Sequence, residues 1–277
     1  MKERKIKAFK RILVANRGEI SCRIQNTCHR LGIETLAVGS LVDQEALHMQ
    51  IADKAVVIGS ADAKDSYLNG AAILQTALQY GADAIHPGYG FLSENPDFAQ
   101  DVREAGLIFI GPSPEAIRAM GSKVQAKSIA QSVNVPVIYG YQGGENLLEA
   151  TERIGFPLLI KATYGGGGKG MRRVNDASEF DGALAACRRE AMASFGNDQV
   201  MLERYIYRPR HVEVQVLGDS YGKCIVLSDR DCSLQRRHQK VIEEAPAVGL
   251  SSQLRKKLHE AAVSIAQSVG YEGLRNR

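Results

Sequence analysis

The chain has 277 residues, of which 44% are hydrophobic and 24% are charged, and its formal net charge is +4 at pH 7. This length fits about two domains, and the composition excludes intrinsic disorder, collagen and fibrous coiled coils. So mild a charge argues against nucleic acid or an anionic membrane as the main partner. No apolar run approaches the ~20 residues that span a bilayer. We therefore expect no nucleic-acid partner and no membrane partner.

The cysteines and the N-terminus give information on the compartment. Five scattered cysteines form no C-x-x-C pair, which argues against a zinc site or a disulfide framework and indicates a reducing compartment. Residues 1–10 are basic, include Glu3 and contain no apolar segment, so we expect neither a secretory signal nor a convincing mitochondrial presequence. A processed matrix protein would look the same.

The first 110 residues alternate short apolar runs with amphipathic stretches. A first helix is predicted because Ile20, Ile24, Cys28 and Leu31 have the spacing of one helical face. A second is predicted at about 67–80, and a third after Asn95-Pro96, an N-cap followed by Pro. Strands separated by helices indicate a parallel sheet covered on both faces, in a doubly wound α/β domain. The predicted strands are 11–15, 35–38, 55–58, 83–85 and 107–110.

The remainder has a different pattern. Two helices follow Pro114, the second with the capping-box spacing Ser122-x-x-Gln125. Residues 211–216 alternate polar with apolar side chains, which predicts a half-buried antiparallel strand with 223–227 as its hairpin partner. The other expected elements are strands 157–162 and 199–203, a helix with Phe180, Leu184, Cys187 and Ala191 on one face, and a last helix with Leu254, Leu258, Ala262, Ile265 and Val269 on its apolar face.

A run of four glycines, residues 165–168, lies between Lys161 and Lys169. Ordering so many glycines costs backbone entropy, so a merely structural loop seldom uses them. Their N–H groups can approach a polyphosphate closely and the lysines supply positive charge, although a hairpin tip is the alternative. The sequence matches neither the Walker nor the Rossmann pattern, which disfavours a NAD-dependent dehydrogenase.

Two further segments are candidates for chemistry. Residues 229–240 nearly lack apolar side chains, so we expect them outside the core, either as a solvated charged loop or as donors facing a phosphate or carboxylate. Residues 86–94 (HPGYGFLSE) follow a predicted strand at the edge where open α/β sheets bind ligands, with an ordinary Gly-rich turn as the alternative.

In order, these segments resemble the biotin carboxylase family, whose fold is an ATP-grasp. The resemblance runs in one register from about Phe9 to Gly273 and is most specific at 84–95 (AIHPGYGFLSEN) and 230–246 (RDCSLQRRHQKVIEEAP). Within the family the chain is most similar to the biotin carboxylase part of acyl-CoA carboxylase α subunits of the methylcrotonyl-CoA type. The resemblance implies an N-terminal doubly wound domain at 1–115, linker helices and an ATP-grasp lid at 116–207, and an incomplete C-terminal ATP-grasp half at 208–277.

The resemblance also implies a ligase reaction. ATP phosphorylates bicarbonate to carboxyphosphate, and CO₂ passes to a nitrogen of biotin on a separate carrier domain. The implied ATP-binding residues are Lys123, Lys161, Gly167, Gly168, Glu203, Arg204, Tyr205, Ile206, His211 and His238. Those for biotin and bicarbonate are Tyr89, Gly90, Gln235, His238 and Lys240, with His238 and Lys240 as the catalytic pair.

Further expectations concern cofactors and partners. The resemblance implies Mg²⁺ or Mn²⁺ with the ATP, a carboxyltransferase subunit beside the biotin carrier domain, and a homo-oligomer. It implies the mitochondrial matrix in a eukaryote and the cytoplasm otherwise. The acyl-CoA or keto-acid acceptor cannot be assigned, because that chemistry belongs to a separate domain.

The sequence departs from the family in its last residues. The family continues with strands whose acidic side chains bind Mg²⁺ and whose arginine acts at the carboxylation centre, whereas Gly273 is here followed by Leu-Arg-Asn-Arg. We therefore assign no metal ligand, expect little carboxylase turnover, and expect strands 211–216 and 223–227 to lack their flanking neighbours. A non-catalytic, truncated nucleotide- or partner-binding isoform is the alternative; another ATP-grasp ligase is disfavoured by the 235–240 segment.

Overall fold

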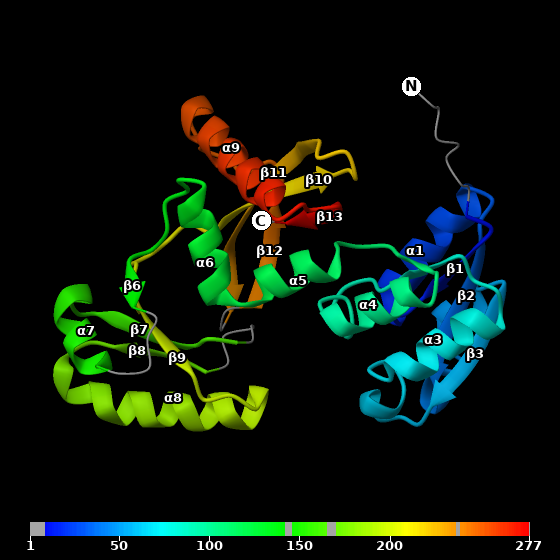
Figure 1. Cartoon of the computed structure of the whole chain (residues 1–277), viewed down its shortest axis with the longest axis horizontal. Coiled ribbons are helices and arrows are strands. Elements are labelled where there is room, and N and C mark those ends of the chain that lie inside the picture. Colours follow the sequence, from blue (N-terminus) through cyan, green and yellow to red (C-terminus); the bar gives the residue numbers. More distant parts are fainter. Residues whose placement is uncertain (1–8, 142–145, 165–169, 237–238, 277) are drawn as a thin grey trace. The chain divides into compact units, whose positions relative to one another are not determined.

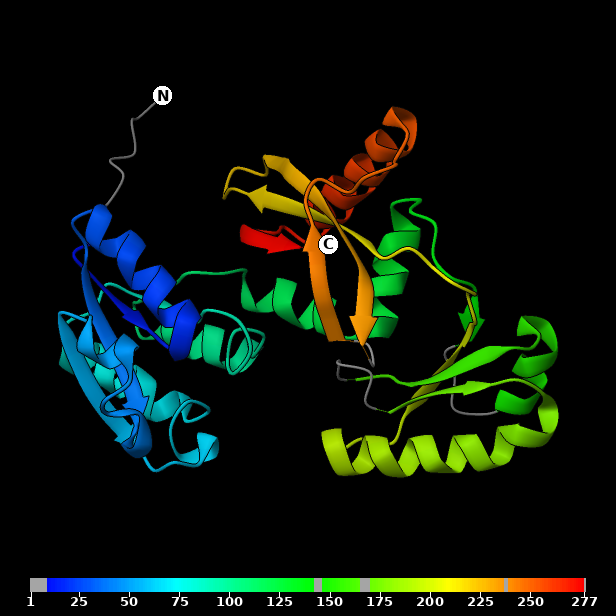
Figure 2. The same cartoon turned by 180° about the vertical axis from the view of Figure 1, so that it is seen from behind.

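The computed structural model describes residues 9–141, 146–164, 170–236 and 239–276 (Figures 1 and 2). The chain divides into two compact units, residues 1–117 and 118–277. Among the described residues, no helix combines the length and the apolar character that crossing a membrane requires.

Unit 1 contains a parallel sheet of five strands in the order β3-β2-β1-β4-β5. All five predicted strands are confirmed, although the last has only two residues. The strands are β1 (Arg11–Val14), β2 (Glu34–Ser40), β3 (Lys54–Gly59), β4 (Ala84–His86) and β5 (Ile108–Phe109).

Helices cover both faces of this sheet. Successive side chains of β1 point to opposite sides, so each face offers apolar side chains against which a helix packs. On one face, α1 (Gly18–Arg30) packs against Ile12 and Val14. On the other, α3 (Gly70–Gln79) and α4 (Pro96–Glu104) pack in the core that contains Leu13. The doubly wound architecture is therefore confirmed. The short helix α2 covers Leu47–Gln50.

The helix ends test the finer predictions. Asn95 caps α4 as predicted, its Oδ1 accepting from Phe98 N at 2.9 Å. Helix α3 begins three residues later than expected, because Asn69 is its N-cap and accepts from Ala72 N. Leu31 follows the last turn of α1 and is 69% exposed, so its predicted place on the buried face is wrong.

The first sheet of unit 2 is antiparallel, in the order β6-β9-β7-β8. Helices α7 (Leu147–Ile154) and α8 (Phe180–Phe195) share one core with it (Figure 2), and Phe180, Cys187 and Ala191 are buried as predicted. Two helices precede it, α5 (Pro114–Gly121) and α6 (Lys123–Ser132). The strands are β6 (Gly140–Tyr141), β7 (Leu158–Ala162), β8 (Met171–Val174) and β9 (Val200–Arg204).

The second sheet of unit 2 has the order β12-β11-β10-β13 and is also antiparallel. Helix α9 (Ser252–Ser268) packs Ala262 and Ala266 against it, whereas Leu254 is exposed, contrary to the prediction. The strands are β10 (Val212–Gly218), β11 (Cys224–Arg236), β12 (Gln239–Glu244) and β13 (Gly273–Asn276).

This sheet confirms the predicted hairpin and corrects two expectations. Strand β11 continues through Arg236, so most of the segment expected as a charged loop is a strand in which Asp229 and Cys232 are buried. The expectation that strand 211–216 lacks a flanking neighbour is also wrong, because β10 pairs with β13. Strand β11 pairs with β12 only between Asp231 and Arg236, so within the described part of the chain no second neighbour of 223–227 is seen.

Candidate functional site

In unit 1, the predicted ligand edge is built where β1 and β4 end. The strand order reverses between these neighbours, and such a switch point leaves a crevice at the carboxyl ends of the strands. Asn16 follows β1, and its Nδ2 donates to the carbonyls of Pro87 and Tyr89, each at 2.8 Å. Gly88 has φ +65°, and a methyl group there would lie 2.7 Å from Nδ2 of Asn16, so the turn requires glycine.

Three side chains and one glycine complete this edge. Tyr89 is 60% exposed and its hydroxyl donates to the carboxylate of Glu19. Gly90, with φ +66°, has open space around it. Burial lowers the pKa of His86 to about 4, with a smaller effect of Arg23, so the ring is neutral at pH 7 and its Nδ1 accepts from Gly88 N at 3.1 Å.

In unit 2, three lysines gather around one carboxylate. We call Lys123, Lys127, Lys161 and Glu203 the lysine cluster. Lys161 on β7 donates to Oε2 of Glu203, and the Nζ of Lys127 lies 2.7 Å from its Oε1. Lys123 begins α6 and donates to the carbonyl of Ala162 at 2.9 Å. The cluster thus joins α6, β7 and β9.

Charge in the lysine cluster is unevenly matched. Burial opposes ionisation of Glu203, but hydrogen bonds from Lys127 and Lys161 hold its pKa below the usual value. Burial, and then the charge of Lys161, lowers the pKa of Lys123. Among the described residues, the contact recorded for its ammonium group is with a carbonyl and not with a carboxylate. A half-buried group of cations with one anion is suited to binding a further anion.

The chain leaves β9 through three predicted nucleotide-binding residues. Arg204 N donates to the Tyr139 carbonyl at 3.0 Å, and Tyr205 N to the Pro157 carbonyl at 3.1 Å. Ile206 is 42% exposed. Residues 204–206 therefore adjoin the lysine cluster through Glu203, while Gly167, Gly168 and His238 lie outside the described residues.

A second cluster lies on β10, β11 and β12. We call Glu213, Arg230, Lys240 and Glu243 the Glu213 cluster. Glu213 is 7% exposed; Arg230 donates to one of its oxygens and Lys240 to the other. Oε2 of Glu243 lies 3.7 Å from Nε of Arg230, and its Oε1 lies 3.5 Å from Nζ of Lys240.

The electrostatics fix the charged state of this cluster. Burial opposes ionisation of Glu213, but Lys240 and Arg230 hold its pKa below the usual value. Burial of Lys240 acts in the opposite direction to its hydrogen bond with Glu213, and the net effect raises the pKa of the lysine. Lys240 is therefore a fixed cation, one-third exposed.

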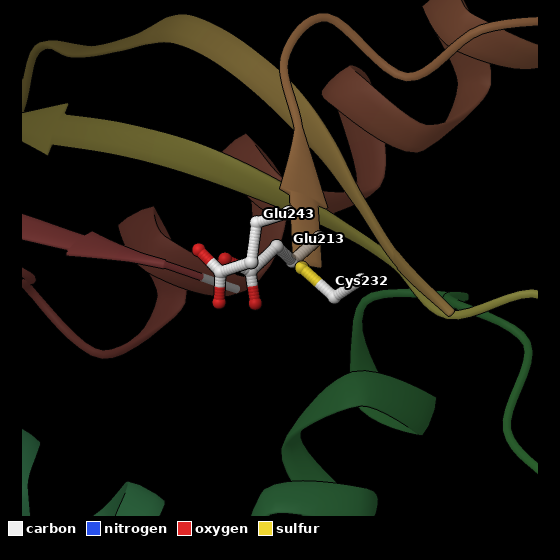
Figure 3. A group of neighbouring side chains, drawn as sticks. All are labelled: Glu213, Cys232 and Glu243. Carbon is white, nitrogen blue, oxygen red and sulfur yellow. The ribbon is translucent and has the colours of Figure 1, made fainter. Parts of the chain in front are cut away.

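Figure 3 shows the one group of described side chains placed as metal ligands could be: Glu213, Cys232 and Glu243, whose ligand atoms lie within 4.8 Å of one another. Mg²⁺ prefers an octahedron of oxygens and does not suit a thiol. Both carboxylates also contact Arg230 and Lys240. The group therefore does not fit Mg²⁺.

Two predicted residues meet beside this cluster. The Nε2 of Gln235 lies 2.6 Å from Nδ1 of His211 and donates to the Cys232 carbonyl at 2.7 Å. His211 N donates to Oγ of Ser233 at 2.8 Å. The structure thus brings His211 and Gln235 together, next to the strand that carries Lys240.

Sequence reasoning missed Lys127, Glu213, Arg230 and Glu243. Lys127 lies one helical turn after Lys123, a spacing that places both on one face of a helix. Glu213 and Arg230 are opposite each other on paired strands. The spacing of the two lysines is a signal that the sequence contains, whereas the pairing of Glu213 with Arg230 depends on a strand register that it does not show.

The comparisons divide the chain in the same way. Residues 8–117 match the family model for the biotin carboxylase N-terminal domain, and residues 122–276 match that for the ATP-binding domain of the carbamoyl-phosphate synthase L chain. The chain is 53% identical to mitochondrial methylcrotonoyl-CoA carboxylase subunit alpha of Oryza sativa subsp. japonica, covering 95% of this chain and 36% of that protein. It is 51% identical to the biotin carboxylase of Nostoc sp., covering 96% and 60% respectively.

A solved structure agrees. The biotin carboxylase domain dimer of 2-oxoglutarate carboxylase from Hydrogenobacter thermophilus, in complex with MgADP, ADP and bicarbonate, superposes with a TM-score of 0.93 at 42% identity. The match covers 97% of this chain and 60% of that one. The chain therefore spans less than two thirds of these relatives.

Proposed function

The chain belongs to the biotin carboxylase family, and on that premise we propose that it binds ATP and bicarbonate for the carboxylation of biotin. ATP phosphorylates bicarbonate to carboxyphosphate, and CO₂ passes to biotin on a carrier domain. The names of the relatives support a place in a methylcrotonyl-CoA-like carboxylase, in the mitochondrial matrix of a eukaryote. The carrier domain, a carboxyltransferase subunit and further copies of the chain are the proposed partners.

The observation that carries this proposal is the lysine cluster. Phosphoryl transfer depends mainly on positioning the phosphates and neutralising their charge. Lys123 and Lys161 supply two ammonium groups at the end of β7, the strand that leads into the glycine run. We assign them to the ATP phosphates, and residues 203–206 to the adenine edge.

The Glu213 cluster is assigned to the bicarbonate. Lys240 is a cation whose position is set by Glu213 and Glu243, so it can attract a small anion without titrating near neutral pH. His211 and Gln235 line the same region through their mutual contact. Tyr89 and Gly90 of unit 1, and His238, remain assigned to biotin.

Mg²⁺, when bound to ATP, would neutralise charge on the β- and γ-phosphates. The described side chains do not fit that ion, so no step is assigned to it. The alternative of a non-catalytic module is not favoured by the comparisons. Another ATP-grasp ligase is disfavoured by the match of residues 8–117 to the biotin carboxylase N-terminal domain.

Nucleotide titration calorimetry on the full chain tests the proposal. A charge-assisted hydrogen bond contributes roughly 1.5–3 kcal/mol, so Lys123→Gln and Lys161→Gln should each weaken ADP binding by about 10- to 100-fold. Lys223→Gln, at an exposed turn of the same unit, is the matched control and should leave binding unchanged. Absence of binding by the unmodified chain, or equal binding by all variants, would overturn the proposal.

A further inference from the structure

Glu203 is held between two lysines, of which only Lys161 was expected at this site. Lys127 Nζ lies 2.7 Å from Oε1 of Glu203, and Lys161 donates to Oε2. Lys127 also donates to the Ile138 carbonyl at 2.7 Å. Its side chain is 16% exposed, and that of Glu203 is 8% exposed. Lys127 is therefore engaged within the protein by two acceptors.

The charge balance explains why a third lysine matters. Lys123, Lys127 and Lys161 carry three positive charges against the one negative charge of Glu203, which leaves a net charge of +2. Without Lys127, Lys161 would be the one ammonium bonded to this carboxylate among the described residues. The carboxylate would then neutralise Lys161 more completely.

We infer that Lys127 is a positioning residue for the phosphates of the nucleotide. It binds one carboxylate oxygen of Glu203 and so leaves the remaining donors of Lys161 free for a phosphate, since an ammonium group has three donors. Lys127 acts through Glu203 and Lys161 and does not itself bind the ligand. This inference rests on the proposed function, because it needs a polyphosphate beside Lys161.

A series of nucleotides separates this role from a structural one. Titration of the full chain with adenosine, ADP and ATP should show that Lys127→Met weakens ATP binding by about 10-fold, ADP binding less, and adenosine binding by less than about twofold. Lys127→Arg keeps the charge and should restore ATP binding to within about threefold. Equal weakening for all three ligands would overturn the inference, because loss of structure does not depend on the number of phosphates.

A double-mutant cycle tests the path through Glu203. In a Glu203→Gln background the neutral amide no longer neutralises Lys161, so adding Lys127→Met should change ATP affinity by less than about twofold. The same 10-fold loss in both backgrounds would mean that Lys127 binds the nucleotide directly, and would refute the inference. If the unmodified chain binds ATP and Lys127→Met binds it equally well, this inference alone fails; if the unmodified chain binds no nucleotide, the proposed function fails as well.

Discussion

Asp229 joins the second sheet of unit 2 to helix α9. Its carboxylate is 2% exposed and accepts from Ala247 N at 2.7 Å, from Nε of Arg255 at 2.9 Å, and from Nε2 of His259 at 2.8 Å. Arg255 also donates to the Ala247 carbonyl at 2.5 Å. One buried carboxylate therefore connects β11, the turn after β12, and α9.

The Asp229→Ala variant removes both carboxylate oxygens, and with them the three hydrogen bonds that they accept. A hydrogen bond to a charged group contributes roughly 1.5–3 kcal/mol, and an unsatisfied buried N–H adds roughly 1–3 kcal/mol. We therefore expect the free energy of unfolding to fall by at least about 4 kcal/mol. Asp229→Asn keeps one acceptor oxygen and the shape of the side chain, so a loss of about 2 kcal/mol is expected.

Urea unfolding followed by circular dichroism measures this loss. Asp198→Ala, which removes an exposed carboxylate of the same unit, should change stability by less than about 0.5 kcal/mol. A loss below about 1 kcal/mol for Asp229→Ala would refute this expectation, because the hydrogen bonds of the buried carboxylate would then contribute almost nothing to stability.

The pH dependence of the free energy of unfolding, compared between the unmodified chain and Asp229→Ala, tests independently whether Asp229 stabilises the fold as a carboxylate. Burial opposes ionisation of Asp229, but His259, Ala247 N and Arg255 hold its pKa below the usual 3.8. A carboxyl with a lowered pKa stabilises the fold above its unfolded pKa and loses that contribution as the pH falls through the folded value. The difference in stability between the unmodified chain and Asp229→Ala should therefore be constant above about pH 5 and narrow below 3.8.

Three further predictions concern unit 1 and the metal. Burial lowers the pKa of His86 from 6.5 to about 4, so between these pH values the unfolded chain binds a proton that the folded chain does not. The free energy of unfolding should therefore fall by about 3 kcal/mol as the pH drops from 6.5 to 4. A His86→Gln variant that loses stability equally steeply over this range would contradict the prediction. Gly88→Ala should lower the free energy of unfolding in urea by about 2–4 kcal/mol, since alanine disfavours the left-handed backbone there and would displace Asn16. Gly106→Ala is the control: Gly106 has φ +78° and open space around it, so only the left-handed backbone should cost stability, about 1–2 kcal/mol. Equal losses for the two variants would be inconsistent with a close contact between residue 88 and Asn16. Millimolar Mg²⁺ without nucleotide should give the same thermal unfolding midpoint as NaCl of equal ionic strength, because the carboxylates of the Glu213 cluster already contact Arg230 and Lys240. A higher midpoint in Mg²⁺ than in NaCl would argue for an ion site.

The sequence was most informative where local pattern and tertiary structure agree. In unit 1, apolar runs separated by helices predicted the five parallel strands, and Asn95-Pro96 predicted the start of α4. The prediction for Leu31 was wrong because periodicity alone does not show where a helix ends. Leu31 is the C-cap of α1 and lies outside the buried face of the helix.

The second sheet of unit 2 shows why strand pairing was harder to predict. The hairpin at 223–227 was expected, but a bulge between Gln215 and Val216 shifts the register by one residue. That shift places Arg230, and not Asp229, opposite Glu213. Because side chains alternate between faces, Asp229 then points to the core and its polar character is satisfied by α9. Composition could not show this pairing, so a charged loop and a set of donors facing an anion both stayed open for the segment.

The candidate site was predicted in part for a related reason. Lys123, Lys161 and Glu203 were assigned through the family resemblance, and the structure brings them into one cluster. Lys127 was missed because a lysine on an exposed helix is ordinarily solvated. Only the tertiary structure, which brings Lys127 of α6 to Glu203 of β9, gives it a buried acceptor.

The central claim is that the lysine cluster binds the phosphates of a nucleotide. A crystal structure of this chain with bound ADP tests it most directly. We expect phosphate oxygens within hydrogen-bonding distance of the ammonium groups of Lys123 and Lys161, with Lys127 still bonded to Glu203. A nucleotide whose phosphates contact neither Lys123 nor Lys161 would contradict it.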